Sequence, residues 1–274
     1  MSTKSKTYHV GLTLSGGGTR GVAHIGVLKA LDECGIKPEV ISGVSAGAIV
    51  GALYASGIKP ENIMDLLCRK EFYSCSGFSF SFKGLLEMKG LRSDLKKHCA
   101  KKFSDLQTPM FVGATSLNTG KIRYINKGGL VKAVIASSSL PALYSPVEFG
   151  GEALVDGGLV DNMPTTPLRD ECKCLIGSNV NPMGEVMEID NMLQIATRTF
   201  QIIARSNVEG CADCDLLVEP NNLLNHNFLN NSKAQRVYEI GYMAAKKSIQ
   251  GYMNNHKSSQ IKQTEGNQQI LKVG

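Results

Sequence analysis

Residues 9–21 read HVGLTLSGGGTRG, and this stretch decides how the chain begins to fold. Its first six residues have the pattern of a β-strand, and three consecutive glycines follow at positions 16–18. From Val22 onward, apolar residues recur at helical spacing, at Ile25, Leu28 and Leu31. The stretch therefore predicts a strand, a glycine loop and a helix, with loop N–H groups gathered where they can bind a phosphate or an oxyanion.

Two nucleotide-binding interpretations of this loop compete with an oxyanion site. Residues 16–21 formally fit the dinucleotide pattern GxGxxG, which expects an acidic residue about 20 positions later to bind ribose. That partner is poorly matched, because the chain runs from Glu39 straight into a second motif. A phosphate-loop NTPase is excluded, since no Gly-Lys-Ser or Gly-Lys-Thr follows the glycines.

The second motif is GVSAG at residues 43–47, between the apolar pair Val40-Ile41 and a small-residue helix pattern from Ala46. A serine between a strand and a helix, with glycines two positions away, is typical of a nucleophile elbow. Gly43 and Gly47 leave room for the sharp turn, and the helix N-terminus favours negative charge on the serine or its adduct. Ser45 is therefore a candidate catalytic nucleophile.

These two motifs and the downstream sequence Asp156-Gly157-Gly158 occur in order, and together they resemble the signatures of the patatin-like phospholipases. The resemblance covers about Val10 to Leu217. It implies an α/β fold with three α/β/α layers and a mostly parallel sheet, related to the catalytic domain of cytosolic phospholipase A2. It also implies hydrolysis of lipid acyl esters by a Ser–Asp dyad without a catalytic histidine. The implied roles are nucleophile for Ser45, general base for Asp156, and oxyanion hole for Gly16, Gly17 and Gly18.

The residues around Asp156 are consistent with the role of a base. Asp156 follows the strand-like run 152–155 and precedes two glycines, Gly157 and Gly158, that permit a tight turn. A carboxylate with its ordinary pKa of about 4 is a weak base at neutral pH, so this one must be partly desolvated. The alternative is that Asp156 begins only a surface turn, as most Asp-Gly pairs do.

The histidines offer a Ser-His-Asp triad as an alternative to the dyad. Of the five, His9, His24, His98, His226 and His256, only the last two follow the aspartate, and both lie in polar sequence. His24 lies one helical turn after Arg20 and is interpreted as structural. Arg20 itself either binds loop carbonyls or helps to hold a phosphate head group.

Length and composition fit one sizeable domain. The 274 residues divide into an acyl hydrolase core at 8–220, a loop and helix at 221–253, and a mobile polar tail at 254–274. The sequence shows no apolar run of about 18 residues and no secretory leader, so we expect a cytoplasmic protein. The net charge of +6 is spread along the chain without aromatic-basic interleaving, which disfavours nucleic-acid binding.

Eight cysteines are interpreted as reduced thiols, and we expect no cofactor and no metal. Cys172 and Cys174, with Cys211 and Cys214, resemble two halves of a zinc site. Both pairs lie next to apolar runs rather than in the glycine-rich turns typical of zinc sites. Ordinary packing is therefore the preferred interpretation of these cysteines.

Elsewhere helix and strand patterns alternate, as in an α/β layer fold. Helices are expected at 60–67, 93–103, 131–137, 190–205 and 232–252. Strands are expected at 110–115 and 121–125, which form a hairpin, and at 174–179 and 216–218.

Substrate recognition is assigned to residues 72–91, which are rich in aromatic side chains. An acyl chain needs an apolar channel, and a flap carrying Phe72, Phe78, Phe80 and Phe82 can supply one. Alternatively, the alternating phenylalanines pack on the core. The lysine-rich helix near residues 96–102 could contact an anionic membrane surface, but a solvated helix face is the preferred interpretation.

The sequence therefore predicts a lipid acyl hydrolase that acts on phospholipids or lysophospholipids. A general carboxylesterase or thioesterase with the same site stays open, as does a non-catalytic lipid- or nucleotide-binding module. Oligomeric state, head group and acyl length are left undetermined.

Overall fold

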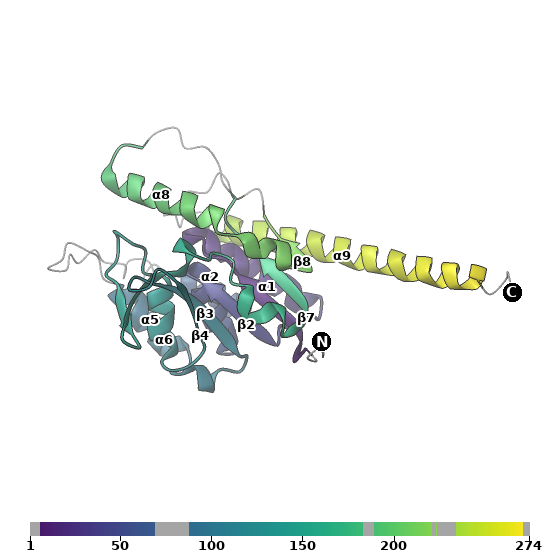
Figure 1. Cartoon of the computed structure of the whole chain (residues 1–274), viewed down its shortest axis with the longest axis horizontal. Helices are drawn as coiled ribbons and strands as arrows, with labels where there is room; N and C mark the ends of the chain where they lie inside the picture. Colours follow the sequence, from purple (N-terminus) through teal and green to yellow (C-terminus); the bar gives the residue numbers. More distant parts are fainter. Residues whose placement is uncertain (1–5, 69–87, 183–188, 221–222, 224–233, 271–274) are drawn as a thin grey trace.

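A computed structural model describes residues 6–68, 88–182, 189–220, 223 and 234–270. Strands and helices alternate along it; the strands form one central sheet, and the helices lie around it (Figure 1). The strands are β1 Tyr8–Leu14, β2 Val40–Val44, β3 Met110–Ser116, β4 Ile122–Ile125, β5 Val147–Phe149, β6 Glu152–Asp156, β7 Cys172–Ser178 and β8 Leu216–Val218. The α-helices are α1 Val22–Glu33, α2 Ala46–Ala55, α3 Pro60–Cys68, α5 Lys89–His98, α6 Leu130–Ser137, α7 Thr166–Arg169, α8 Met192–Ser206 and α9 Ala234–Ile270.

Four short 3₁₀ helices complete the described elements. Two of them carry the motifs: η1 Gly18–Gly21 forms from the glycine loop, and η3 Gly157–Leu159 follows Asp156. The other two are η2 Phe103–Asp105 and η4 Glu209–Asp213.

The sheet is mostly parallel, with strand order β5-β6-β3-β2-β1-β7-β8 and β4 paired to β3. Strands β3, β2, β1, β7 and β8 run parallel, while β4 and β6 are antiparallel to β3. The connection from β1 to β2 moves one way across the sheet, and that from β7 to β8 moves the other way. Right-handed crossovers then place α1 and α8 on opposite faces. The reversal between β1 and β7 is a topological switch point, where α/β proteins bind ligands.

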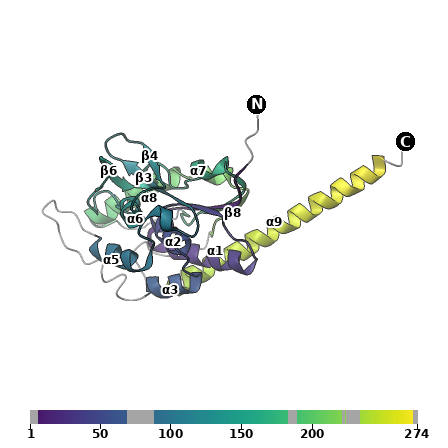
Figure 2. The ribbon, with the colours of Figure 1, turned by 90° about the horizontal axis from the view of Figure 1, so that it is seen from below.

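Helices cover both faces of the sheet (Figure 2). On one face the main apolar core includes Leu12, Ile25, Leu53 and Ile135, all of which are buried. On the other face α7 closes a smaller cluster against β2 and β7. The expected three-layer α/β fold is therefore confirmed.

The first half of α9 packs along α1, and its second half extends away from the sheet (Figure 1). Gly26 of α1 faces the backbone of Tyr238, and Gly241 of α9 faces the backbone of Ala23. A methyl group at either glycine would collide with main-chain atoms of the other helix. Glycine at these positions lets the two helix backbones touch.

The structure corrects two element boundaries. The helix expected at 93–103 is α5 Lys89–His98, which begins earlier and ends before the separate turn η2. The last helix, expected at 232–252, continues to Ile270 as α9, so residues 254–270 are helical, while the mobility of this tail stays a prediction. The other expected helices and strands are found within a few residues of their predicted limits. Phe72, Phe78, Phe80 and Phe82 lie outside the described residues, as does the flap assigned to them.

No helix in the described residues is long and apolar enough to cross a membrane.

Candidate active site

Ser45 stands between the end of β2 and the start of α2, as an elbow requires. Its backbone has φ 52° and ψ −120°, an uncommon conformation for a residue with a side chain. The turn is held by Ser137, whose Oγ accepts the Ser45 N–H at 2.9 Å and donates to the Gly113 carbonyl at 2.6 Å. The surrounding structure therefore fixes the serine in a strained, half-buried position.

Asp156 reaches Ser45 through the register of the sheet. Val44 pairs with Gly113 on β3, so the elbow serine lies level with the next residue, Ala114. Ala114 pairs on its other side with Asp156. The two residues thus flank one position of β3, and the Ser45 hydroxyl interacts with the Asp156 carboxylate and lowers its pKa.

The Asp156 carboxylate is almost completely buried, with 1% of the residue exposed. Its Oδ1 accepts the Gly158 N–H at 2.9 Å. Burial raises the pKa of Asp156 to about 7, against the opposing effect of its bonds with Ser45 and Gly158. A carboxylate with this pKa is a far better proton acceptor at neutral pH than an exposed one.

This pKa predicts the pH dependence of a reaction that uses Asp156 as base. The base acts only when it is ionised, so kcat/KM should rise about tenfold per pH unit below pH 7 and level off above it. The measurement is a kcat/KM profile on a neutral ester between pH 5 and 9. A flat profile across this range would show that the ionisation of Asp156 does not limit the reaction.

The glycine loop lies beside Ser45. A side chain at Gly16 would collide with Asn162 Oδ1 and would lie 3.2 Å from Ser45 Cβ. The Gly16 N–H makes a long bond of 3.4 Å to the Asn162 carbonyl. Within the described part of the chain, the N–H groups of Gly17 and Gly18 donate to no protein acceptor. Gly18 has φ 56°, which glycine adopts without strain.

The remaining motif glycines permit close approaches around the two catalytic candidates. A side chain at Gly43 would collide with the backbone of Gly47, and one at Gly47 would collide with the carbonyls of Leu14 and Ser15. A side chain at Gly157 would come within 2.5 Å of the Gly113 carbonyl oxygen. One at Gly158 would meet Asn162 Oδ1 at 2.7 Å and Phe200 of α8 at 3.3 Å.

Two side chains at this site escaped the sequence reasoning: Asn162 and Asn181. Asn162 is 1% exposed and lies between Gly16 and Gly158, so it links the glycine loop to the turn after Asp156. Asn181 donates from Nδ2 to the Gly16 carbonyl. Nothing in the sequence distinguishes these polar residues from ordinary loop residues, because their contacts are made between distant segments.

Histidines do not complete a triad among the described residues. His24 is fully buried, with Nδ1 2.8 Å from Ser178 Oγ and Nε2 2.9 Å from the Ser15 carbonyl oxygen. Burial lowers the pKa of His24 to about 4, so the ring stays neutral and structural, as expected. His9 and His98 are exposed, and His226 lies outside the described residues.

Arg20 is buried beside the same loop, and its Nη1 donates to the Pro182 carbonyl at 3.0 Å. Burial and the charge of Arg198 lower the pKa of Arg20 to about 10. Of the two expected uses of this arginine, the structure contains the bond to a loop carbonyl. Contact with a phosphate head group stays a prediction.

The cysteine pairs lie in packed surroundings. Cys172 is fully buried against Gly11, and the Cys214 thiol donates to the Gly210 carbonyl at 3.4 Å. Burial raises the pKa of Cys172 to about 11 and that of Cys214 to about 12, so both remain protonated. No group of three or more potential metal ligands is found in the part of the chain that the structure describes.

A serine on a strained elbow of a mostly parallel sheet, beside a buried carboxylate, is typical of the serine hydrolases. Residues 12–169 match the family model of the patatin-like phospholipases, which covers more than half of the chain. The chain therefore belongs to the patatin-like phospholipase family.

Curated relatives share this part of their sequence with the chain. It is 32% identical over 170 residues to a lysophospholipase of Emericella nidulans, a match that covers 58% of the chain and 11% of the relative. It is 26% identical over 292 residues to a lysophospholipase of Saccharomyces cerevisiae, covering 92% of the chain and 17% of the relative. The chain thus spans less than a fifth of the length of these relatives.

Among solved structures, VipD of Legionella pneumophila is similar to the chain with a TM-score of 0.56 and 16% identity. The match covers 92% of this chain and 72% of VipD, and it shows a shared fold. Human GIVD cytosolic phospholipase A2 also matches, with a TM-score of 0.46, 11% identity, and coverage of 91% of the chain and 59% of that protein.

Proposed function

We propose that this chain is a serine acyl hydrolase that cleaves acyl esters of phospholipids or lysophospholipids through an acyl-Ser45 intermediate. The observation that carries the proposal is the position of Ser45 beside the buried Asp156 carboxylate, whose pKa the serine hydroxyl lowers. A serine needs an adjacent base to become a nucleophile, and this pair supplies both at the edge of the glycine loop. Membership of the patatin-like phospholipase family supports a lipid ester as the substrate.

In the first half of the proposed reaction, Ser45 Oγ attacks the acyl carbon while Asp156 accepts the hydroxyl proton. The carbonyl oxygen becomes an oxyanion, which the N–H groups of Gly17 and Gly18 bind. Gly16 keeps the loop close to Ser45 because it carries no side chain. When the intermediate collapses, the ester bond breaks and the leaving alcohol takes the proton from Asp156.

In the second half, water attacks the acyl-Ser45 ester and gives one proton to Asp156. The oxyanion forms again in the same hole, and its collapse releases the fatty acid. Asp156 returns the proton to Ser45 Oγ. A single carboxylate therefore serves as base and acid in both halves, and its pKa near 7 suits both tasks at neutral pH.

A lipid surface as partner has support from the outer face of α8. Met192, Ile195 and Ile202 are exposed there, at 81%, 49% and 50%, while Phe200 on the same helix lies against Gly158. Helix α8 contains two arginines and no acidic residue. An apolar face next to the site suits peripheral contact with lipid. Co-sedimentation of the native chain and of an Ile195→Gln variant with lipid vesicles would measure this contact.

The test of the function compares the native chain with Ser45→Ala and the matched control Ser104→Ala. Ser104 is exposed and bonds only its neighbour Asp105, at 2.9 Å, among the contacts described. We expect the native chain and the control to hydrolyse a p-nitrophenyl acyl ester and a fluorogenic lysophospholipid, and Ser45→Ala to lose both activities. Full activity in folded Ser45→Ala would contradict the proposal.

The ratio of these two native rates separates the alternatives. Fast turnover of the short ester with none of the lysophospholipid would favour a general carboxylesterase, and a matching result with an acyl thioester would favour a thioesterase. Binding of lipid without any turnover would favour the non-catalytic module.

A further inference from the structure

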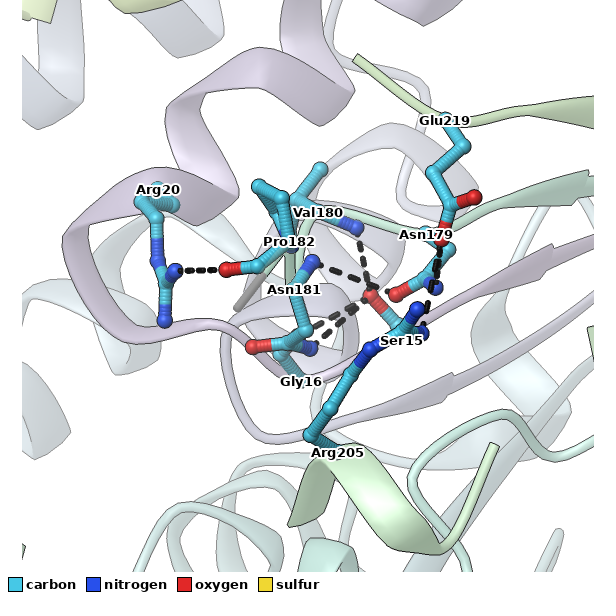
Figure 3. A network of polar contacts seen from close by, with 9 residues as sticks. All are labelled: Ser15, Gly16, Arg20, Asn179, Val180, Asn181, Pro182, Arg205 and Glu219. Atoms are coloured by element: carbon cyan, nitrogen blue, oxygen red, sulfur yellow. Dashed lines mark hydrogen bonds and ion pairs between the residues drawn. The ribbon is translucent and has the colours of Figure 1, made fainter. Parts of the chain in front are cut away.

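The carbonyl group of Gly16 is held by two side chains from different loops (Figure 3). Ser15 Oγ donates to this carbonyl at 2.9 Å, and Asn181 Nδ2 donates to it as well. Ser15 follows β1 and Asn181 follows β7, so the two loops meet at the switch point of the sheet. None of the catalytic roles proposed above uses either side chain.

Both residues are fixed by further contacts. Ser15 is fully buried and Asn181 is 7% exposed. Ser15 Oγ accepts the Val180 N–H at 3.0 Å, and the Asn181 N–H donates to Asn179 Oδ1 at 3.2 Å. Asn179 in turn donates to Glu219 at 2.7 Å, which ties the network to the end of β8 (Figure 3).

The held carbonyl determines where the next N–H points. In a planar trans peptide the C=O of one residue and the N–H of the next point in opposite directions. With the Gly16 carbonyl bound by Ser15 and Asn181, the Gly17 N–H must point away from them. The next peptide is restrained in the same way. The Gly17 carbonyl accepts the Arg20 N–H at 3.2 Å, so the Gly18 N–H must point away from that bond.

A Gly-Gly peptide needs such restraint more than other peptides do. Glycine reaches positive and negative φ about equally, so the peptide between Gly16 and Gly17 can rotate at low cost. The rotated form would turn a carbonyl oxygen, in place of an N–H, toward the developing oxyanion. Such a site would repel the charge it has to stabilise.

We propose that Ser15 and Asn181 are positioning residues that lock the Gly16–Gly17 peptide with its N–H toward the acyl oxyanion. The inference rests on the proposed function, since it concerns the same site. It assigns to the loop after β7 a part in the reaction, although this loop touches neither Ser45 nor Asp156 in any contact described above.

The test uses Ser15→Ala, which removes one donor, and Asn181→Leu, which removes the other at similar volume. Because an oxyanion donor acts in the transition state, we expect kcat to fall by about 10- to 100-fold while KM stays nearly constant. Inhibition by an acyl trifluoromethyl ketone, which forms an oxyanion adduct, should weaken by the same factor. Binding of an unreactive ether analogue of the substrate should not change.

The matched control is Ser56→Ala. Ser56 Oγ also donates to one carbonyl, that of Ala52 at 2.7 Å, and accepts one N–H, that of Ala100 at 3.0 Å, but it lies far from the glycine loop along the chain. This variant should lose similar bonds without any change in kcat or in ketone affinity. If Asn181→Leu does not fold, the measurements of kcat and ketone affinity are made on Ser15→Ala alone, since this change removes only a hydroxyl group.

Crystal structures of the variants provide a readout that needs no activity. We expect the Gly16–Gly17 peptide to be rotated or to occupy two orientations in the double variant. A peptide unchanged in that variant, or unchanged kcat and ketone affinity in folded variants, overturns the proposal. A rotated peptide in a chain whose native form hydrolyses no ester would support the lock and contradict the proposed function.

Discussion

Asp156→Asn is expected to lower kcat by about 10³- to 10⁴-fold, because the variant keeps the shape of the side chain and loses the proton acceptor. The carboxylate is buried beside Ser45 and has a pKa near 7, so no neighbouring group described here replaces it. The measurement is single-turnover hydrolysis of a p-nitrophenyl ester, which isolates acylation of the serine from its later hydrolysis.

The matched control for this variant is Asp161→Asn. Asp161 lies five positions further on, and burial raises its pKa as well, but its carboxylate binds the Tyr124 hydroxyl at 2.6 Å and the Met163 N–H at 3.0 Å. We expect hydrolysis by this variant to stay within a few-fold of native. Equal losses in both variants would mean that buried charge in this region supports the fold rather than the chemistry.

The same carboxylate should shape the stability of the protein. Native Asp156 binds a proton up to about pH 7, while in the unfolded chain it ionises near its ordinary pKa of 3.8. Between these values the native state holds more protons, so its free energy of unfolding falls as the pH rises. Asp156→Asn is neutral throughout and should lack this part of the pH dependence in thermal unfolding. The variant can therefore lose activity while it keeps or gains stability at pH 8.

Gly16→Ala is the second change with a large expected effect. The added methyl group would collide with Asn162 Oδ1 and press toward Ser45 Cβ, 3.2 Å away. Because Asn162 is buried and its neighbours are packed, the glycine loop must shift away from the serine. We expect kcat to fall by about 10²- to 10³-fold, as when one oxyanion donor is lost, measured by steady-state ester hydrolysis.

Gly251→Ala is a suitable control for this substitution. Gly251 lies on α9 and nothing approaches within 4 Å of where its methyl group would stand. Alanine should leave hydrolysis unchanged and favour the helix slightly. If Gly16→Ala were equally harmless, the position of the loop beside Ser45 would have no importance for catalysis.

The local elements of this fold could be predicted from sequence because each carries its own pattern. The strand, glycine loop and helix of residues 9–31, and the turn at Ser45, are each encoded within a few neighbouring residues. The hairpin at β3 and β4 is encoded in the same way, by two short apolar runs around a turn. The boundaries of α5 and α9 were less accurate, since polar helices lack the apolar spacing that marks a helix end.

The geometry of the site could be predicted only in part. Asp156 was identified by its motif, but its distance from Ser45 depends on how β6 pairs with β3, which local sequence does not encode. Asn162 and Asn181 were missed for the same reason, since each meets the glycine loop from a segment more than 140 residues away. Their amides have no sequence pattern that separates them from ordinary loop residues.

The central claim is that the acyl group of the substrate is transferred to Ser45 before water releases it. The most direct test mixes the native chain with an excess of a p-nitrophenyl acyl ester and stops the reaction with acid within milliseconds to seconds. The masses of the protein and of its peptides are then measured by mass spectrometry. The account predicts an increase equal to one acyl group on the peptide that contains Ser45, and none in Ser45→Ala. Rapid hydrolysis with no adduct at Ser45, and equally rapid hydrolysis by Ser45→Ala, would contradict it.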